Sequence, residues 1–357
     1  MKHVIKKFKI SGELISITSH GGGHINKTFK VITSSNKYIL QKINHHVFKD
    51  VDKLMSNISY TTEFMKSAKI KSFIPLEIIK TISGENYLYY NEEYYRMYNF
   101  ISEGIGYETI ENVEQFYECG VGFGAFQQML SEFDANKLYE TIPNFHNTRV
   151  RFQNFLTAIK NDKKGRVSEI KEDIDFYLSH KHYCDVIINL LEKKEMPTRV
   201  THNDTKLNNV LISPKTNKSV TIVDLDTIMP GSVVYDFGDS IRFGANHSKE
   251  DEPDLSKVNF DIELFEAYTK GFLSKTANIL TKIEVEHLAF GAILMTYECG
   301  MRFLTDYING DVYFKIHYPK QNLNRSRTQV KLVKDMQKAL LQMNEIVNKY
   351  YKLFKNV

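Results

Sequence analysis

The sequence predicts an α+β fold in two lobes: a small N-terminal lobe built on an antiparallel β-sheet, and a larger, mainly helical C-terminal lobe. Short alternating apolar segments separated by turn residues fill residues 1–103, whereas apolar residues at helical spacing dominate residues 104–357. The chain has 357 residues, 42% of them hydrophobic, which suffices for a substantial core. We therefore place the boundary between the lobes near residue 103.

The predicted N-terminal lobe begins with a meander of three strands. Glycines at 21–23 and the polar turn at 34–36 separate them, and a helix with one apolar face follows. A hairpin and one further strand complete the lobe. The predicted strands cover 14–18, 28–32, 38–40, 78–82, 87–89 and 94–101, and the helix covers 51–65.

The C-terminal lobe is predicted to be helical apart from short strands near residues 200–226. Gly120, Gly122 and Gly124 lie within one helical segment, where close helix packing is the expected reason for glycine. The predicted helices cover 116–130, 149–159, 169–191, 261–272 and 332–350.

The most informative motif is H-x-D-x-x-x-x-N, formed by His202, Asp204 and Asn209 between two apolar segments. Phosphoryl-transfer enzymes use this spacing to present an Asp base and an Asn that holds magnesium. We interpret Asp204 as the catalytic base and Asn209 as a metal ligand. In the alternative interpretation the segment is a polar turn in which His202 and Asn203 cap main-chain groups.

A β-branched run delivers Asp224 to the end of a strand, where its carboxylate suits a hard divalent cation bound to phosphates. Strand periodicity predicts that Asp226 points the same way, as an outer-sphere ligand or a substrate contact. Asp236 begins a D-F-G tripeptide but lies far beyond Asp204, after Pro230. We therefore assign the metal to Asp224 and predict that Asp236 fixes the catalytic segment by accepting hydrogen bonds.

The N-terminal lobe offers candidates for nucleotide binding. Gly22 and Gly23 join two strands, and glycine lets the main chain approach phosphates. On the next strand either Gln41 or Lys42 faces the nucleotide, and Glu63 is the candidate partner on the following helix. The strand that leaves this lobe, including Arg96, Met97, Tyr98 and Asn99, is predicted to bracket adenine through its main chain.

Together these segments resemble the aminoglycoside-phosphotransferase-like small-molecule kinases, which include the choline kinase-like enzymes. The flanks of the catalytic motifs are similar to those of the N-acetylhexosamine 1-kinases. The resemblance covers about residues 12–335. It rests on residues 21–26, 38–44, 202–209, 224–239 and 297–307.

The resemblance implies a bilobal, protein-kinase-like fold with ATP and Mg²⁺ in the cleft. It also implies phosphate transfer to the anomeric hydroxyl of GlcNAc or GalNAc, a small-molecule sugar substrate. By motif position, His24, Asp204, Arg302 and Tyr313 would line the sugar site. The departure from the wider kinase pattern is the strand lysine, for which Lys42 is an uncertain match.

Acceptor chemistry is consistent with this expectation. An anomeric hydroxyl is more acidic than an ordinary alcohol, so an ordinary carboxylate suffices as its base. A cationic aminoglycoside would need an acidic cleft, but residues 301–327 carry more basic than acidic side chains. Two alternatives stay open: a kinase for another alcohol, such as choline, homoserine or an aminoglycoside, and an inactive nucleotide-binding pseudokinase.

Composition narrows the possible binding partners and the expected location of the protein. The net charge is +4, with basic and acidic residues interspersed, so no nucleic-acid partner is expected. Three scattered cysteines and an N-terminus without the apolar core of a signal peptide predict a cytoplasmic protein. No apolar run approaches membrane-spanning length, so no membrane association is expected. We expect a monomer.

Overall fold

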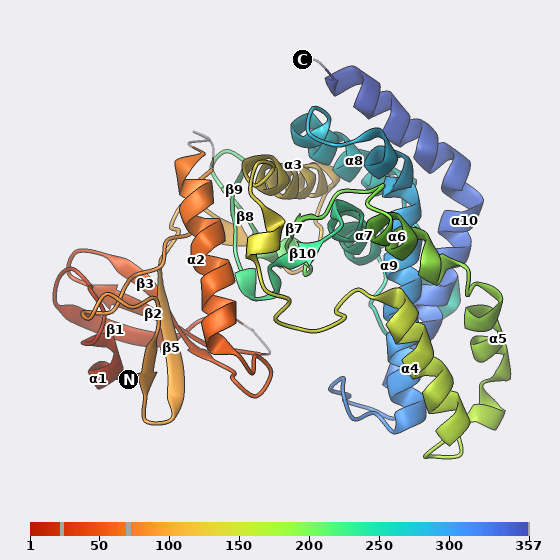
Figure 1. The fold of residues 1–357 in the computed structure, drawn as a ribbon, viewed down its shortest axis with the longest axis horizontal. Helices are drawn as coiled ribbons and strands as arrows, with labels where there is room; N and C mark the ends of the chain where they lie inside the picture. Colours follow the sequence, from red (N-terminus) through yellow and green to blue (C-terminus); the bar gives the residue numbers. More distant parts are fainter. Residues whose placement is uncertain (22–24, 69–72, 356–357) are drawn as a thin grey trace.

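The computed structural model describes residues 1–21, 25–68 and 73–355 and arranges them in the predicted two-lobed α+β fold (Figure 1). The elements of the N-terminal lobe are α1 (Lys2–Ile5), β1 (Leu14–Ser19), β2 (Lys27–Thr33), β3 (Lys37–Ile43), α2 (Val51–Ser67), β4 (Leu88–Tyr90) and β5 (Glu93–Asn99). The five strands form one antiparallel sheet in the order β1-β2-β3-β5-β4. Its three-strand meander and the helix after it confirm the sequence pattern.

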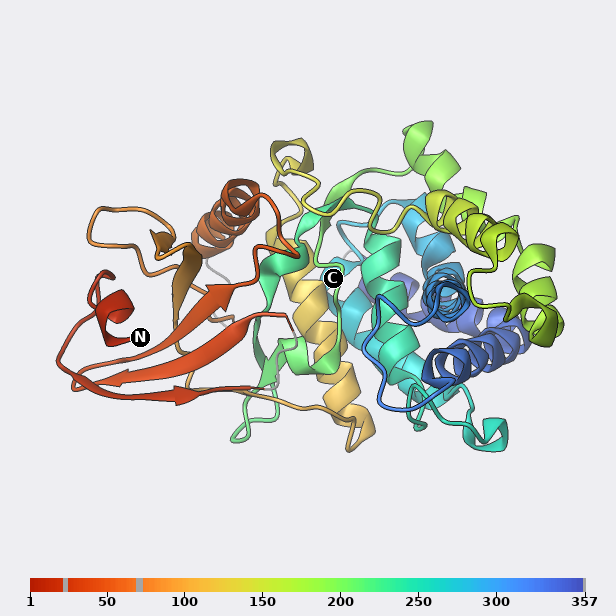
Figure 2. The same cartoon turned by 90° about the horizontal axis from the view of Figure 1, so that it is seen from below.

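The two faces of this sheet bury different residues, because strand side chains alternate. On β3, Tyr38 and Leu40 pack with α1 in one apolar cluster. Ile39 and Ile43 point the other way and pack with α2 and the C-terminal lobe. Figure 2 shows the sheet and α2 on one side of the molecule and the long helices on the other. The face that carries Ile39 and Ile43 is therefore the one that meets the C-terminal lobe.

The predicted hairpin between 78–82 and 87–89 is wrong. β4 pairs with the beginning of β5 instead, and Ile78 and Thr81 make only isolated bridges to other segments. Asn91 and Glu92 form the turn, with φ values of 50° and 61°. Two consecutive left-handed residues are the geometry that a tight hairpin favours. The prediction placed the hairpin turn at Gly84 because glycine is common in turns, whereas the turn lies at Asn91 and Glu92.

Helices build most of the C-terminal lobe. They are α3 (Val113–Met129), α4 (Thr148–Asn161), α5 (Lys171–Ser179), α6 (Tyr183–Glu192), α7 (Val233–Gly244), α8 (Ile262–Thr276), α9 (Lys282–Asn309) and α10 (Gln321–Phe354). The short strands are β6 (Ile105–Gly106), β7 (Arg199–Thr201), β8 (Val210–Ile212), β9 (Ser219–Ile222) and β10 (Met229–Gly231). β6, β8 and β9 form one small sheet, and β7 pairs with β10.

Four of the five predicted helices are confirmed as α3, α4, α8 and α10, but the single helix predicted over 169–191 is wrong. α5 ends at Ser179 and α6 begins at Tyr183, with short-range turn hydrogen bonds between them. Apolar residues keep helical spacing across the break, so periodicity did not reveal it. The sequence pattern also left α7 and the whole of α9 unpredicted.

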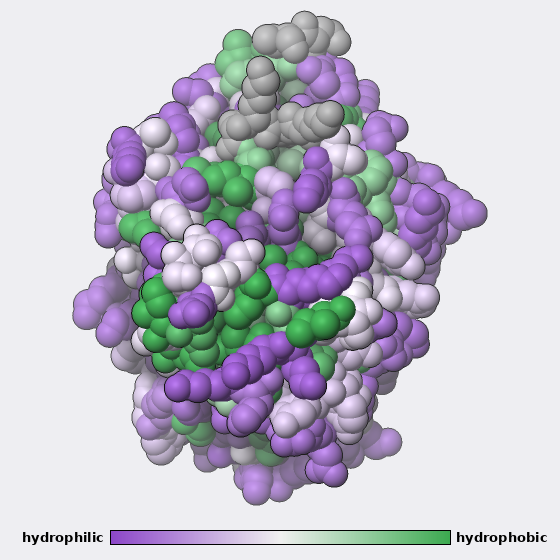
Figure 3. All heavy atoms as spheres, turned by 90° about the vertical axis from the view of Figure 1, so that its left-hand side faces the viewer, coloured by the Kyte–Doolittle hydropathy of each residue, from purple (hydrophilic) through white to green (hydrophobic). Residues whose placement is uncertain are grey.

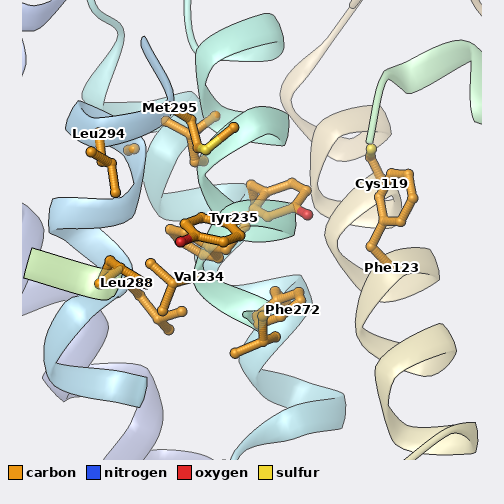
Figure 4. Packing of buried hydrophobic residues seen from close by; sticks show 14 of the residues in the cluster. Cys119, Phe123, Val234, Tyr235, Phe272, Leu288, Leu294 and Met295 are labelled. Atoms are coloured by element: carbon orange, nitrogen blue, oxygen red, sulfur yellow. The ribbon is translucent and has the colours of Figure 1, made fainter. Parts of the chain in front are cut away.

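The centre of the C-terminal lobe is packed by α3, α7, α8 and α9. Figure 4 shows Val234 and Tyr235 of α7 among side chains from α9 and α8, with Phe123 of α3 nearby. Gly120 and Gly124 allow α3 to approach α8. A Cβ atom at Gly120 would lie 2.3 Å from the carbonyl oxygen of Tyr268, which confirms the packing role predicted for these glycines.

The end of the N-terminal lobe carries a patch of hydrophobic surface framed by hydrophilic residues (Figure 3). Large exposed hydrophobic residues of this lobe include Ile15, Ile82 and Tyr89. Across the described ranges, no helix combines the length and apolar character needed to cross a membrane.

Candidate active site

Asp204 lies in the loop between β7 and β8, at the junction of the two lobes. Its Oδ1 atom is 2.7 Å from the Nζ atom of Lys206. Its Oδ2 atom and its main-chain carbonyl accept hydrogen bonds from the Asn209 amide, at 3.3 and 2.8 Å. The structure thus brings the predicted base and the predicted metal ligand into contact. It adds an ammonium group that sequence reasoning did not assign.

His202 is completely buried and positions this loop. Its Nε2 atom donates to the carbonyl oxygen of Val223 at 3.0 Å, because a carbonyl can only accept. Nδ1 is then the acceptor for the Asp204 main-chain N–H at 3.3 Å. Asn203 adds a hydrogen bond to the carbonyl oxygen of Thr227 at 2.8 Å. The capping interpretation of His202 and Asn203 is therefore correct, and these caps hold the catalytic segment in place.

Asp224 follows β9 with a left-handed main chain, φ 61° and ψ 61°. A short 3₁₀ turn over Leu225–Thr227 comes next, so the predicted strand does not continue and Asp226 does not follow from strand periodicity. That expectation was wrong because Asp224 turns the chain. The two carboxylates are nevertheless close. Desolvation in the cleft, with the charges of Asp226 and Asp204, raises the pKa of Asp224 to about 7.

Asp236 has the structural role predicted for it. It lies in the first turn of α7, where one oxygen accepts the main-chain N–H of His202 and the other that of Asn203, both at 2.8 Å. The side chain of Gln127 on α3 donates to Asp236 at 3.0 Å. Three donors therefore converge on one buried carboxylate, which fixes the main chain just before Asp204.

The open choice on β3 is resolved in favour of Gln41. Its side chain accepts from Arg96 at 2.9 Å and donates to Thr28 at 3.1 Å, on the face toward the C-terminal lobe. Lys42 points to the opposite face and forms an ion pair with Glu93 at 2.5 Å. Glu63, the candidate partner, accepts from Ser59 on its own helix.

Three of the predicted binding residues, Gly22, Gly23 and His24, lie outside the described residues. The turn that contains them connects Gly21 with Asn26, whose position is described. Asn26 donates to the Oδ2 atom of Asp226 at 2.5 Å and accepts the main-chain N–H of Asn44 at 2.9 Å. Asn26 thus links the start of β2 to Asp226 of the other lobe.

The main chain of the segment Arg96–Asn99 is hydrogen-bonded to neighbouring segments. Met97 accepts from the main-chain N–H of Ile79 at 2.8 Å, and Asn99 donates to Glu77 at 3.1 Å. Arg96 and Tyr98 pair with β3. The side chain of Met97 packs in the cluster with α1, away from the cleft. The contact of this segment with adenine stays a prediction.

Arg96 instead provides a buried charge. Only 1% of its side chain is exposed, and its Nη2 atom forms an ion pair with Asp226. Its Nε atom donates to Gln41. The guanidinium also lies 5.3 Å from the ring centroid of Tyr98. Arg96 therefore joins β3, β5 and the loop after β9 across the lobe boundary.

The predicted sugar-site residues of the C-terminal lobe lie close to each other. The guanidinium of Arg302, on α9, lies 5.6 Å from the ring centroid of Phe314, and the rings of Tyr313 and Phe314 are 4.8 Å apart. Tyr313 is 71% exposed. The side chain is thus accessible to a small molecule, while Arg302 stands partly buried behind it.

A buried polar cluster, missed by sequence reasoning, adjoins Arg302. His146 and Thr148 both bond the Glu298 carboxylate, at 2.9 and 2.5 Å. Burial alone would raise the pKa of Glu298, but these hydrogen bonds and Arg302 lower it overall. Within the part of the chain that is described, His146 Nε2 has no hydrogen-bond partner. No local pattern marks His146, because its partners lie about 150 residues away in sequence.

The donor set at the loop fits magnesium. Among the described residues, no three His, Cys, Asp or Glu side chains converge as a closed metal cage. Mg²⁺ is usually held by one or two carboxylates, with waters and substrate phosphates completing its shell. Asp224 and the amide oxygen of Asn209 are oxygen ligands of this kind.

The fold and this arrangement of Asp204, Lys206 and Asn209 define a phosphotransferase with a protein-kinase-like architecture. The chain belongs to the phosphotransferase enzyme family, because the model of that family matches residues 16–271.

Several solved structures share this fold. An aminoglycoside phosphotransferase from Alicyclobacillus acidocaldarius is 12% identical, with a TM-score of 0.65 over 98% of this chain and 96% of that chain. A microcompartment-associated aminopropanol kinase is also 12% identical, with a TM-score of 0.59 over 96% and 97% of the two chains. An ethanolamine kinase from Plasmodium vivax is 14% identical, with a TM-score of 0.55 over 88% and 82%. At these identities the likeness extends to the fold alone.

Proposed function

We propose that this chain is an ATP- and Mg²⁺-dependent kinase that phosphorylates the anomeric C1 hydroxyl of an N-acetylhexosamine. The observation that carries the phosphotransfer chemistry is the position of Asp204 between Lys206 and Asn209. The proposal for the acceptor rests on the resemblance of the motif flanks and on the charges around Arg302.

In this proposal Asp204 accepts the proton of the attacking hydroxyl. Lys206 lies beside it and places positive charge where the phosphoryl group is transferred. Asn209 and Asp224 would hold Mg²⁺, which neutralises the charge of the phosphates. The caps from His202 and Asp236 keep Asp204 in position, so that little reorganisation accompanies proton transfer.

The charges around Arg302 favour a neutral acceptor over a cationic one. Burial and the charge of Arg302 lower the pKa of Arg151, so two guanidinium groups lie close together. The acidic groups nearby are already engaged. Glu298 is bound by His146 and Thr148, and Asp306 accepts main-chain N–H groups of residues 312–314. A cationic amino alcohol or aminoglycoside would meet positive charge here without a carboxylate to bind it.

Two of the basic residues within 301–327 are already engaged by other groups. Arg327 forms an ion pair with Asp173 on α5, and Arg325 donates to Asn322 and Lys315 on its own side of the lobe. These cations are therefore committed elsewhere. Arg302 is the member of this segment on which the acceptor proposal depends.

An acceptor panel tests the proposal. Purified protein with Mg²⁺ and ATP should convert GlcNAc or GalNAc to an acid-labile sugar 1-phosphate, and should turn over ethanolamine, aminopropanol and spectinomycin far more slowly. ADP release with an amino alcohol but with neither sugar would overturn the acceptor assignment. Nucleotide binding without turnover of any acceptor would favour the pseudokinase alternative.

Two variants test the acceptor residues. Arg302→Met should raise the KM for the sugar and leave the KM for ATP unchanged. Arg327→Met is the matched control, because it removes the same charge from a guanidinium held by Asp173. Equal effects of both variants on the sugar KM would contradict the role of Arg302.

A further inference from the structure

We propose that Arg96, on β5, supplies the fixed positive charge that binds the nucleotide phosphates in this chain. Kinases with this architecture commonly give that role to a lysine on the third strand. The inference rests on the proposed nucleotide chemistry of the cleft. It gives the side chain of Arg96 a role, whereas the sequence suggested only a main-chain contact with adenine at this position.

The position on β3 where related kinases carry a lysine holds an uncharged residue in this chain. Gln41 is the β3 residue directed to the cleft face, and the neighbouring Lys42 points to the opposite face, where Glu93 binds it. Arg96 stands directly opposite Gln41 in the β3–β5 register. A cation on β5 at this level therefore reaches the same region as a cation on β3 would.

The guanidinium of Arg96 has nitrogen atoms with and without a bonding partner. Nε donates to Gln41 and Nη2 pairs with Asp226, whereas Nη1 has no hydrogen-bond partner in residues 1–21, 25–68 and 73–355. Arginine carries five donors in a rigid fork, which suits phosphate oxygens. A buried unpaired donor is costly. The side chain is only 1% exposed, so in this proposal a phosphate oxygen reaches Nη1 once the two lobes move apart enough to admit the nucleotide, and it then satisfies the donor that folding leaves unpaired.

The partners of Arg96 also connect it to a cavity in the N-terminal lobe. This cavity has a volume of about 300 Å³ and is lined by residues at the end of β1, at the start of β2 and next to them, including His20, Asn26 and Thr28. Asn26 donates to Asp226, and Thr28 accepts from Gln41. Both partners of Arg96 are thus hydrogen-bonded to residues that line the cavity. A phosphate chain running from this cavity toward Asp224 would pass these groups.

The ion pair also explains how an arginine is kept in place without nucleotide. Desolvation alone would lower the pKa of Arg96, but Asp226 and Asp224 keep it raised. Asp226 therefore serves as the internal counter-ion of Arg96, and it needs no part in binding the metal. This assignment addresses the role of Asp226, which the sequence left open.

The experiment compares the affinities of ADP and adenosine, measured by calorimetry in EDTA so that no metal contributes. Removing Arg96 alone would leave Asp226 buried and unpaired, which destabilises the fold. The test variant is therefore Arg96→Met combined with Asp226→Asn. We expect ADP affinity to fall about 10- to 100-fold, as for a lost charged hydrogen bond, while adenosine affinity stays within a few-fold.

Two further variants separate a phosphate contact from a structural effect. Lys42→Met alone should not weaken ADP binding, because Lys42 points to the opposite face and Arg96 stays in place. Gln41→Lys combined with Arg96→Met moves the cation to β3 and should restore most of the ADP affinity. Equal losses for ADP and adenosine, or unchanged ADP affinity in the first double variant, would overturn the proposal. Failure of the unmodified protein to bind ADP would instead refute the proposed function.

Discussion

Asp236 and Asn203 are joined by a hydrogen bond of 2.8 Å from the main-chain N–H of Asn203 to the carboxylate. The other oxygen of Asp236 receives the main-chain N–H of His202, so one side chain of α7 holds two successive residues of the catalytic loop. Asn203 has a left-handed main chain with φ 64°. The tripeptide that resembles the metal-binding D-F-G motif therefore acts here as a clamp.

Replacing Asp236 by Asn should destabilise the protein and slow the reaction. The amide turns an N–H donor toward a main-chain donor, and one buried N–H is left unpaired. We expect the free energy of unfolding to fall by about 1–3 kcal/mol, with a lower kcat because Asp204 loses its support. Urea unfolding and steady-state kinetics measure the two effects. Asp204→Asn is the contrasting variant, and should abolish turnover without a comparable loss of stability.

Asp224 should make the metal-free protein less stable as the pH rises. Its folded-state pKa is raised to about 7 from an ordinary value of 3.8, so between these values the folded protein binds the extra proton. Stability therefore declines as the pH increases through that window. Asp224→Asn should raise the Tm in EDTA, and the gain should be larger at pH 8 than at pH 5.

The pH dependence is the essential part of this measurement. Asn also tolerates the left-handed main chain at position 224, but that benefit is the same at every pH. A gain in Tm that does not change between pH 5 and pH 8 would show that charge is not the cause.

Lys206→Met should lower kcat about 10²- to 10³-fold, as expected when one group that stabilises the transition state is removed. The KM for ATP should change much less than kcat. Lys215→Met is the matched control, since Lys215 is an exposed lysine beyond the same loop. Comparable kcat values for the two variants in an ADP-release assay would exclude Lys206 from catalysis.

Gly120→Ala should destabilise the protein by about 1–3 kcal/mol through overpacking. The added methyl group would lie 2.3 Å from the Tyr268 carbonyl oxygen, and main chain cannot yield easily. Gly122→Ala should cost less, because its nearest neighbour is the end of the Val210 side chain at 2.9 Å. Thermal unfolding should rank the two variants in this order, with the KM values of both unchanged.

The sequence revealed those parts of the site that are local in the chain. Asp204 and Asn209 lie in one loop, so spacing alone predicted their contact. The packing role of Gly120 was likewise predicted from its place in one helical segment. The identity of the cleft-facing residue on β3 needed the sheet, because strand alternation leaves two equal choices until the buried face is known.

Interactions between distant segments could not be predicted in this way. Arg96 and Asp226 are far apart in sequence, as are Asn26 and Asp226, and neither pair belongs to a local motif. The turn at Asp224 likewise depends on tertiary contacts, since the preceding residues have the pattern of a continuing strand. The cluster around Glu298 depends on where α9 passes the loop before α4.

Gln127 of α3 donates both to Asp236 of α7 and to the carbonyl oxygen of Val200. The catalytic loop is therefore held in place by side chains of α3 and α7. Arg302 and Tyr313 are carried by α9 and the chain beyond it. The parts that perform the reaction and the parts proposed to select the acceptor are thus supported by different helices. Acceptor preference is then open to redesign, or to evolutionary drift, by substitutions in α9 and the following segment, with the phosphotransfer machinery left intact.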